Sequence, residues 1–415
     1  MSYRPAPIAW QPERIAVVGL GLLGASLAEA ARKRWPALRL NAVSSSATLD
    51  KARAAGLITS EDSACDYDHI DSAVAEADLV ILCTPIDHIK SILEKWAAHP
   101  PACKAGCIIT DVGSTKAEIC ALGRKVFPAF RASGALSTKE AKGARGAIFI
   151  GSHPMAGSEK TGLEARDPLL FQNASWVICA DEAPRNDPAV PQSGPETAPK
   201  APALMAEAAD RLESFVRALG ARTARMPAEL HDKVVAHVSH LPQLLSTALA
   251  SYIGERNNVV DNCLQIAGGG FRDMTRLAGS SFKVWEPILR SNLAAVREVV
   301  SGFREHLAAL EAGLEWDLAK DFFRDGNKLR SRLSTARKGF AIPLAEILVD
   351  LEDKPGALVK AFAPLAAARI NILDVEILKV REGEGGVLMM GFHGSDEANA
   401  ALARLESAGF KARLR

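Results

Sequence analysis

The sequence has little net charge, no long hydrophobic run and no cysteine pair at metal-binding spacing. Its 50 Lys and Arg nearly balance 49 Asp and Glu, which leaves a formal net charge of +1. This balance gives no overall attraction for nucleic acid or an anionic membrane, so we expect a small-molecule ligand held by local groups. No run of about eighteen apolar residues occurs, and residues 1–14 lack the apolar core of a signal peptide. We therefore expect a cytoplasmic protein that binds neither nucleic acid nor a membrane.

The cysteines are scattered, and no two have the CxxC spacing of a zinc or redox site. Seven is an odd number, and we expect reduced thiols, as in a cytosolic protein, and no metal. The chain is long, however. Its 415 residues with 48% hydrophobic side chains predict two or three domains, each with a core.

A glycine motif follows the first apolar segment. In RIAVVGLGLLGASLAEAARKRW, residues 14–35, a strand passes through Gly19, Gly21 and Gly24 into an alanine-rich helix. In a dinucleotide-binding GxGxxG motif the first glycine closes the turn, the second admits the pyrophosphate, and the third packs helix on strand. The helix amino terminus then attracts the phosphates. A purely structural glycine turn is the alternative.

Strand and helix alternate beyond the motif through LRLNAVSS, TLDKARAAG, ADLVILCTP and CIITDVGS. This order predicts an α/β fold with a doubly wound parallel sheet of the Rossmann type. Ligands of such sheets bind at the carboxyl ends of the strands. The expected cofactor site comprises Gly19, Leu20, Gly21, Leu22, Leu23, Gly24, Ser44, Ser45, Thr84 and Pro85.

The end of the second strand carries no acidic residue. NAD enzymes of this type usually place Asp or Glu about twenty residues beyond the glycines to bind the ribose hydroxyls. Here Val43 is followed by Ser44, Ser45 and Ser46. Hydroxyls can donate to a 2′-phosphate, which favours NADP, but no arginine follows, and NAD stays open. Alternatively, these serines only solvate a turn.

Two further strand ends carry hydroxyl side chains, Thr84 and Ser114. Either could cap the helix that follows, because Ser and Thr are preferred at that position and Glu118 lies in the first turn after Ser114. We interpret Thr84 as such a cap, although it also faces the cofactor crevice. We interpret Ser114 as a site residue.

Five motifs occur in a fixed order along the chain: the glycine motif, DVGSTK, HPMAGSEKTG, HDKVVAHVSHLP and GGGFRDMTRLAGSS. Together they resemble the prephenate and arogenate dehydrogenase family of tyrosine biosynthesis, over residues 14–335. The resemblance implies oxidative decarboxylation of a cyclohexadienyl substrate, with hydride transfer to NAD(P)+. Prephenate would give 4-hydroxyphenylpyruvate, and arogenate would give tyrosine.

The resemblance implies roles for residues around HPMAG. His153, which follows the strand RGAIFIGS, would accept the hydroxyl proton, since a neutral imidazole does so at physiological pH. Pro154 restricts the backbone of His153 to extended conformations. Ser114 would donate to the same substrate oxygen. Glu159 would lie at the rim of the pocket, whereas we interpret Lys160 as a surface residue.

Three histidines follow in the helical segment 229–253. The resemblance places His240 on the substrate side, and we interpret His231 and Asp232 as structural. His237 and His240 are three residues apart and could share a helix face, but no third metal ligand accompanies them.

One departure from the family concerns the substrate. Many prephenate-using members read SHLPH where this chain reads SHLPQ, with Gln243 at the second histidine position. A glutamine amide can donate to a carboxylate while its carbonyl accepts from an ammonium. Arogenate carries both groups, so it stands beside prephenate as an expected substrate.

The segment GGGFRDMTRLAGSS supplies a cationic clamp. We expect Arg276 to bind a substrate carboxylate, because guanidinium is a planar bidentate donor. Arg272 is the competing candidate, and Asp273 could orient either arginine. A surface Asp–Arg pair three residues apart is the alternative.

Composition divides the chain into three predicted domains. Residues 1–225 form the dinucleotide-binding domain, with a flexible proline-rich insertion at 181–203. Residues 226–340 form a helical substrate and dimerisation domain, whose amphipathic helices predict a homodimer. Residues 344–415 resemble an ACT domain of βαββαβ order, a ferredoxin-like fold.

The expected effector of the ACT domain is tyrosine or another amino acid, which acts only if it binds two states with different affinity. Its expected contacts are Asp353, Gly356 and Asn371, the last where the second strand begins. Alternatively, the domain only aids dimerisation.

Two other functions remain for the whole chain. Another NADP-dependent dehydrogenase, acting for example on 3-hydroxy acids, would not need the HPMAG and GFRDxTR motifs. A non-catalytic amino-acid sensor should have lost His153 or Arg276, and both are present.

Overall fold

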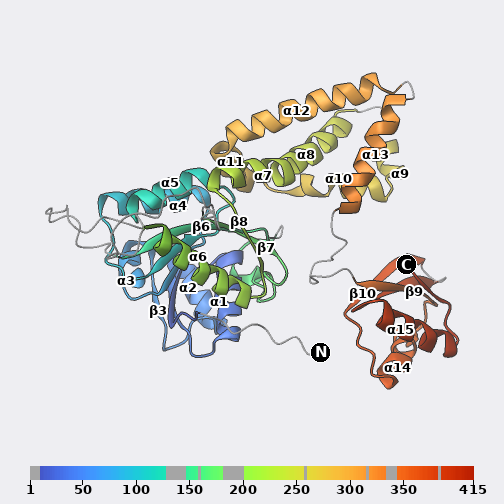
Figure 1. Ribbon diagram of the computed structural model, residues 1–415, viewed down its shortest axis with the longest axis horizontal. Helices are drawn as coiled ribbons and strands as arrows, with labels where there is room; N and C mark the ends of the chain where they lie inside the picture. Colours follow the sequence, from blue (N-terminus) through green and yellow to red (C-terminus); the bar gives the residue numbers. More distant parts are fainter. Residues whose placement is uncertain are drawn as a thin grey trace, which may run out of the picture. The chain divides into compact units, whose positions relative to one another are not determined.

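The structure, a computed structural model, describes residues 10–127, 146–157, 160–180, 201–256, 259–314, 317–332, 344–381 and 385–415. The chain forms two compact units, Met1–Ala312 and Gly313–Arg415. The first contains a large sheet and a group of helices (Figure 1). The second contains α13 (Asp317–Arg332) and a small sheet. The predicted bounds 1–225, 226–340 and 344–415 stay predictions.

The large sheet has the strand order β3-β2-β1-β4-β5-β6-β7-β8. Neighbours are parallel from β3 to β6, which confirms the predicted Rossmann-type sheet, and β7 pairs antiparallel with β6. Among the described residues between β6 and β7, the short turn Leu163–Ala165 is the only helical segment, too little for the crossover that parallel strands need. The strands are β1 (Arg14–Val18), β2 (Arg39–Val43), β3 (Ser63–Cys65), β4 (Leu79–Leu82), β5 (Ile108–Asp111), β6 (Ile148–Pro154), β7 (Ser175–Cys179) and β8 (Arg222–Arg225).

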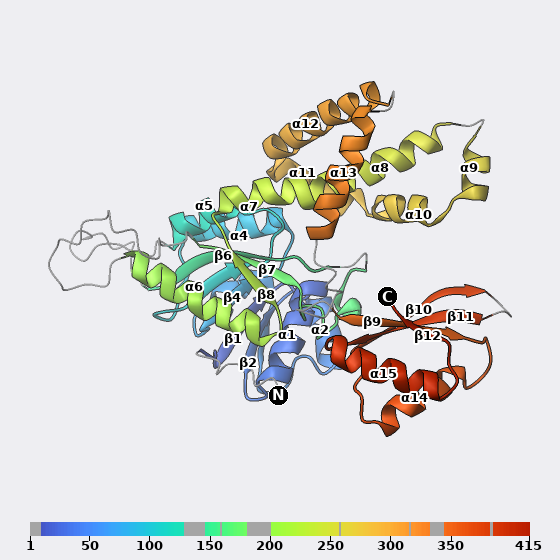
Figure 2. The same cartoon turned by 45° about the vertical axis from the view of Figure 1, so that its right-hand side comes forward.

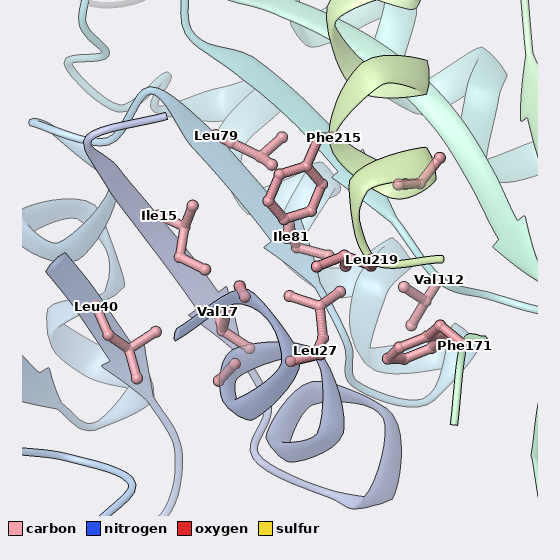
Figure 3. Packing of buried hydrophobic residues seen from close by; sticks show 14 of the residues in the cluster. Ile15, Val17, Leu27, Leu40, Leu79, Ile81, Val112, Phe171, Phe215 and Leu219 are labelled. Carbon is pink, nitrogen blue, oxygen red and sulfur yellow. The ribbon is translucent and has the colours of Figure 1, made fainter. Parts of the chain in front are cut away.

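Helices cover both faces of this sheet. On one face, side chains of α1 and α6 meet the strands, with Leu27 near Val17 and Phe215 near Ile81 (Figure 3). Side chains of α3, α4 and α5 pack on the other face. Because both faces are buried, the central strands β1 and β4 are apolar throughout Ile15–Val18 and Leu79–Leu82, and each fully buried large apolar side chain contributes about 1.5–3 kcal/mol. The helices are α1 (Leu22–Arg34), α2 (Ser46–Ala54), α3 (Ile70–Val74), α4 (Ile86–Ala98), α5 (Ala117–Val126) and α6 (Ala201–Ala218), with a 3-10 turn at Tyr67–His69.

The start of α6 corrects one boundary. The sequence predicts a flexible insertion over 181–203, but α6 begins at Ala201. Pro202 is compatible with a first helical turn, where its missing N–H would have no partner. The rest of the predicted insertion, 181–200, lies outside the described residues.

The helical part of the first unit begins with a continuous helical run. Its middle, Ala236–His240, is a π-helical turn between α7 and α8, with Pro242 just beyond it. Proline cannot donate the regular backbone bond, and single π-turns often occur at functional sites. The helices are α7 (Ala228–Val235), α8 (Leu241–Gly254), α9 (Val260–Ile266), α10 (Gly269–Thr275), α11 (Phe282–Ser291) and α12 (Leu293–Ala312), with a 3-10 turn at Arg276–Gly279.

The small sheet of the second unit has the order β10-β11-β9-β12, with every pairing antiparallel. Both α14 and α15 pack on one face of it (Figure 2). The predicted βαββαβ order of an ACT domain is thus confirmed, although β10 begins three residues beyond Asn371, which lies in the connection after α14. The elements are β9 (Ala345–Leu351), α14 (Ala357–Ala367), β10 (Asp374–Arg381), β11 (Gly385–Phe392), α15 (Ser395–Ser407) and β12 (Ala412–Leu414).

Candidate active site

The glycine motif lies at the topological switch point of the large sheet, between the neighbouring strands β1 and β4, whose following helices pack on opposite faces. Gly19 has φ +99°, a conformation that favours glycine. A Cβ at Gly24 would come within 1.9 Å of the Gly19 carbonyl oxygen, so only glycine lets α1 pack this closely. A Cβ at Gly21 would meet nothing within 4 Å. Of the three glycines, Gly21 is thus the one whose Cα has open space beside it among the described residues.

A cavity of about 240 Å³ adjoins the motif. The buried Oγ1 of Thr84 has no hydrogen-bond partner among the described residues, and α4 begins at Ile86 with no side-chain cap. The interpretation of Thr84 as a helix cap is therefore wrong, and its hydroxyl is available to a bound ligand. The lining residues are Gly19, Leu20, Gly21, Ser44, Thr48, Lys51, Tyr67, Cys83, Thr84, Pro85, Gly162, Leu163 and Glu164.

The rim of this cavity carries hydroxyls and one ion pair. Ser44 is buried at the end of β2, and the hydroxyls of Ser45 and Thr48 lie 2.9 Å apart. Lys51 donates to Glu164 at 2.6 Å. Leu22 and Leu23, also expected at the cofactor, are half-buried at the start of α1. These donors, with the open Gly21, fit a dinucleotide.

A larger cavity of about 660 Å³ lies at the opposite, amino ends of β1, β2 and β4. Its charged groups are largely paired. Asp78 accepts from Lys104 at 2.5 Å and from the backbone N–H groups of Glu13 and Arg14. Because ligands of such sheets bind at the carboxyl ends, this cavity is not the candidate site.

His153 lies within the last residues of β6, one position before its end, rather than after the strand as predicted. Its residue is 9% exposed, and its Nδ1 lies 2.9 Å from Nε2 of His231. Burial lowers the pKa of His153 well below its ordinary value, and the nearby positive charge of Lys116 lowers it further. His153 is therefore neutral at physiological pH, as a proton acceptor must be.

His231 and Asp232 lie directly behind His153. His231 is fully buried, and its Nδ1 lies 2.8 Å from Oδ1 of Asp232. Asp232 also accepts from the backbone N–H groups of Lys116 at 2.7 Å and Ala117 at 2.8 Å. A carboxylate of the helical part thus caps the amino terminus of α5. The two residues interpreted as structural stand next to the candidate base.

A buried ion pair supports the strand end. The ammonium of Lys116 donates to Asp111 and, at 2.8 Å, to the carbonyl of Ser152, the residue before His153. Burial raises the pKa of Asp111, which Lys116 opposes. Because both residues are fully buried, loss of either would leave an unpaired charge.

Ser114 lies in the loop between β5 and α5 and is half-buried. It does not cap α5, whose first N–H groups are taken by Asp232. The expectation that Ser114 is not an ordinary cap agrees with this geometry.

Asn292 links His240 to Asp232. The Asn292 amide donates to the carbonyl of Asp232 at 2.8 Å and lies 3.4 Å from Nδ1 of His240. His240 is buried against Trp285 at a ring-centroid distance of 5.9 Å, and burial lowers its pKa to about 4. Because an amide nitrogen only donates, Nδ1 of His240 accepts and its Nε2 carries the proton.

Gln243 lies one turn beyond His240 and is buried. Its amide nitrogen donates to the carbonyl of Leu277 at 2.8 Å, which fixes the orientation because that carbonyl can only accept. Its Oε1 is buried with no partner among the described residues. Of the two contacts expected of Gln243, the donor is thus engaged and the acceptor is available.

Arg276 directly precedes Leu277, and so lies beside Gln243. Arg276, Arg272 and Asp273 are all exposed. The expected bond from Asp273 to an arginine is absent from the described part of the chain: neither arginine pairs with it, because each extends toward solvent. Glu159 lies outside the described residues.

The remaining expected sites are simple to place. Asp353, Gly356 and Asn371 are exposed in the second unit, and Gly356 starts α14 with φ +84°. His237 is exposed and its Nδ1 contacts the carbonyl of Lys233. Within the described ranges, no three His, Cys, Asp or Glu residues could hold a metal ion, and no helix there is long and apolar enough to cross a membrane.

Sequence reasoning missed the supporting roles of His231, Asp232, Lys116 and Asn292. The adjacent letters HD at the start of a helix were the available signal, but nothing in the sequence indicates that they meet a strand 78 residues earlier. Lys116 belongs to the DVGSTK motif, and its burial was not foreseen.

A crevice at the glycine motif and a buried histidine near the carboxyl end of β6, in the same parallel sheet, are the arrangement expected of a dinucleotide-dependent dehydrogenase. Known proteins agree. The family "Prephenate dehydrogenase, nucleotide-binding domain" matches residues 28–192, its "dimerization domain" matches 227–326, and "ACT domain" matches 345–407. The chain belongs to the prephenate dehydrogenase family.

Individual relatives cover most of the chain. A prephenate dehydrogenase of Bacillus subtilis is 29% identical over 95% of this chain and 96% of its own length. A cyclohexadienyl dehydrogenase of Zymomonas mobilis is 29% identical over 78% and 97%. The crystal structure of Synechocystis arogenate dehydrogenase superposes with a TM-score of 0.57 at 26% identity, covering 77% and 99%. The chain is thus an NAD(P)-dependent dehydrogenase of tyrosine biosynthesis that decarboxylates a cyclohexadienyl substrate.

Proposed function

We propose that His153 is the general base of this reaction. Its neutral, buried imidazole lies at the carboxyl end of β6, and this single observation carries the proposal. His153 accepts the proton of the substrate hydroxyl while a hydride leaves the ring carbon that bears this hydroxyl. Loss of the ring carboxylate as carbon dioxide then makes the ring aromatic. The bound dinucleotide supplies the hydride acceptor, held at Gly21 and Thr84.

We propose that Ser114 donates to the hydroxyl oxygen and orients it toward His153. Arg276 binds a substrate carboxylate, with His240 and Gln243 on the same side of the substrate and Asp273 and Glu159 near the rim. Because the protein holds these groups in place before the substrate binds, the binding energy orients the substrate. This orientation lowers much of the activation barrier. Initial rates with prephenate and arogenate, each with NAD and NADP, test the activity. Turnover in at least one combination is expected, and none in all four would contradict it.

We propose arogenate as a substrate beside prephenate, because Oε1 of Gln243 can accept from an α-ammonium. The sharpest comparison is Gln243→Met, which keeps length but loses the acceptor, against Gln243→His, which restores the SHLPH pattern. The Met variant should lose about tenfold in kcat/KM for arogenate and less for prephenate, since one hydrogen bond to a charged group is worth about 1.5–3 kcal/mol. Equal losses for both substrates would refute the role.

We propose a preference for NADP, with Ser44, Ser45 and Lys51 as donors to the 2′-phosphate. Lys51 lines the cavity, and β2 ends without a carboxylate. Lys51→Met should raise KM for NADP and leave KM for NAD unchanged. Ser44→Asp, which supplies the missing carboxylate, should favour NAD. If Lys51→Met changes both constants equally, the lysine does not read the 2′-phosphate.

We propose a homodimer formed through the helical part, a cytosolic location consistent with seven free thiols, and an amino-acid effector, such as tyrosine, at Asp353, Gly356 and Asn371. Titration of tyrosine against the full chain and a chain ending at 340 tests the effector. Inhibition of the full chain alone is expected, and equal inhibition of both would contradict it.

A further inference from the structure

The hydrogen bonds behind His153 form a chain whose directions can be assigned. Asp232 accepts from the backbone N–H groups of Lys116 and Ala117, so it is an acceptor to all its neighbours. The contact of 2.8 Å between Oδ1 of Asp232 and Nδ1 of His231 therefore requires the proton on that nitrogen. In neutral His231 the other nitrogen, Nε2, then carries a lone pair.

The direction of the bond to His153 depends on His231 being a neutral imidazole. His231 is fully buried and its Nε2 contacts a second imidazole, a setting in which a further buried cation is unfavourable. Asp232 already has its charge balanced by the amino terminus of α5.

The direction of the next bond follows. Nε2 of His231 accepts, so the contact of 2.9 Å is a bond donated by Nδ1–H of His153. A neutral imidazole has one proton, and Nε2 of His153 is therefore the nitrogen with the free lone pair. We infer that His231 and Asp232 are positioning residues that fix His153 in the tautomer whose Nε2 is the base.

The same chain stabilises the product of proton transfer. When His153 gains its second proton, its Nδ1–H becomes a charged donor, and hydrogen bonds with one charged partner are about twice as strong as neutral ones. The logic is that of a base oriented by a second group and a carboxylate. Asp232 lies on α7 and caps the amino terminus of α5, so the packing of α7 against α5 also positions His153.

This inference rests on the proposed role of His153, and the two can fail separately. If His153→Asn keeps full kcat, the proposed base is wrong. If His153→Asn loses kcat but the His231 variants do not, only the inferred chain is wrong.

A matched pair of variants of the full chain tests the inference. His231→Leu removes the acceptor, whereas the side-chain oxygen of His231→Gln can still accept from Nδ1–H of His153. We expect kcat to fall about 100-fold in His231→Leu, in the range of general-base effects, with KM changed only a few fold. His231→Gln should recover at least about tenfold of that loss. Unfolding temperature and dinucleotide affinity establish that each variant is folded. Equal kcat in two folded variants would overturn the inference.

The pH profile separates positioning from a structural role. The titratable groups around His153 are His231 on α7, Lys116 before α5 and His240 in the π-turn. Without the acceptor the protonated form of His153 is less stable, so the acid limb of kcat should move to lower pH in His231→Leu and stay near wild type in His231→Gln. An unmoved limb in a folded His231→Leu contradicts the inference.

A spectroscopic measurement reads the tautomer of the wild-type enzyme directly. Nitrogen-15 NMR of the histidine-labelled enzyme reports which ring nitrogen carries the proton. We expect Nδ1 of His153 to be protonated and Nε2 bare, with assignment by loss of the signals in His153→Asn. A proton on Nε2 would refute the inferred tautomer.

Discussion

The sheet-bearing and helical parts of the first unit treat their apolar side chains differently. Over the described residues up to 225, Leu169 is the large apolar side chain left exposed, at 60%. The helical part exposes a series along several helices, among them Val238, Ile266 and Phe282, the last at 70%. A sheet covered on both faces completes its core within one chain, whereas helices with an uncovered apolar face need a partner surface.

The same contrast runs through the site. On the sheet side, His153, Lys116 and Asp111 are all buried, and Lys116 donates to Asp111 and to the carbonyl of Ser152, the residue before His153. On the helical side, Arg276 and Arg272 are exposed in the single chain. We therefore expect the base to lie on the sheet side, oriented by His231 and Asp232 of α7, and substrate binding to depend on the exposed groups of the helical side.

The largest expected effect is on the sheet side. His153→Asn should lower kcat by about 10²- to 10⁴-fold with a small change in KM, because general-base catalysis contributes that much. Steady-state kinetics measures it, with His237→Asn, an exposed histidine, as the control. If only KM changed, His153 would be a substrate-binding residue and not the base.

The next effect is on the helical side. Arg276→Ala should raise KM by about 10- to 150-fold and leave kcat less affected, because a charged hydrogen bond is worth about 1.5–3 kcal/mol. Arg272→Ala is the matched control and should change KM little. If the two variants exchange behaviour, Arg272 is the carboxylate ligand.

Glycine substitutions sharpen the contrast within the sheet part. Gly24→Ala puts a Cβ 1.9 Å from a backbone oxygen and should destabilise the fold by about 1–3 kcal/mol. Gly21→Ala meets no atom of the chain and should keep stability while weakening dinucleotide binding. Denaturant unfolding and dinucleotide titration measure the two effects. Equal stability of both variants would contradict the packing role of Gly24.

Charge placed on the uncovered helices should change assembly. Phe282→Asp is expected to convert a dimer into a monomer, because it puts a charge on an apolar interface. Leu169→Asp, at a residue that is also exposed but lies in the sheet part, should leave the molecular mass in solution unchanged. Sedimentation measures both, and an unchanged mass for Phe282→Asp would place the interface elsewhere.

The smallest effect concerns stability at low pH. His240 has a folded-state pKa of about 4, below its ordinary 6.5, so the unfolded chain binds more protons between these values. Stability should therefore rise from pH 4 to pH 6.5 and be constant in this respect above it. Between pH 7 and pH 5 the unfolding temperature should fall less in His240→Asn than in the wild type, by a difference on the order of a few degrees. An unchanged slope would show that His240 is not buried as a neutral group.

The sequence predicted the fold well because its patterns are local. Apolar segments such as residues 77–85, the glycine motif and the βαββαβ order each follow from neighbouring residues. The reversal of β7 and the start of α6 within the predicted insertion were not predicted, because proline-rich composition does not locate a helix start.

The sequence named single site residues but not the contacts between them. His153 and Gln243 were named from motifs, and the free acceptor of Gln243 agrees with the expected contact. The chain from His153 through His231 to Asp232 joins residues 78 positions apart, and only the packing of α7 against α5 reveals it. Thr84 was misread because strand-end hydroxyls and helix caps have the same sequence signal.

The pH dependence of kcat for the wild-type enzyme tests the central claim most directly, that a buried neutral His153 is the base. Burial lowers its pKa, so kcat should stay level well below pH 6.5 before it falls on the acid side. An acid limb with an apparent pKa at or above 6.5 would contradict the account.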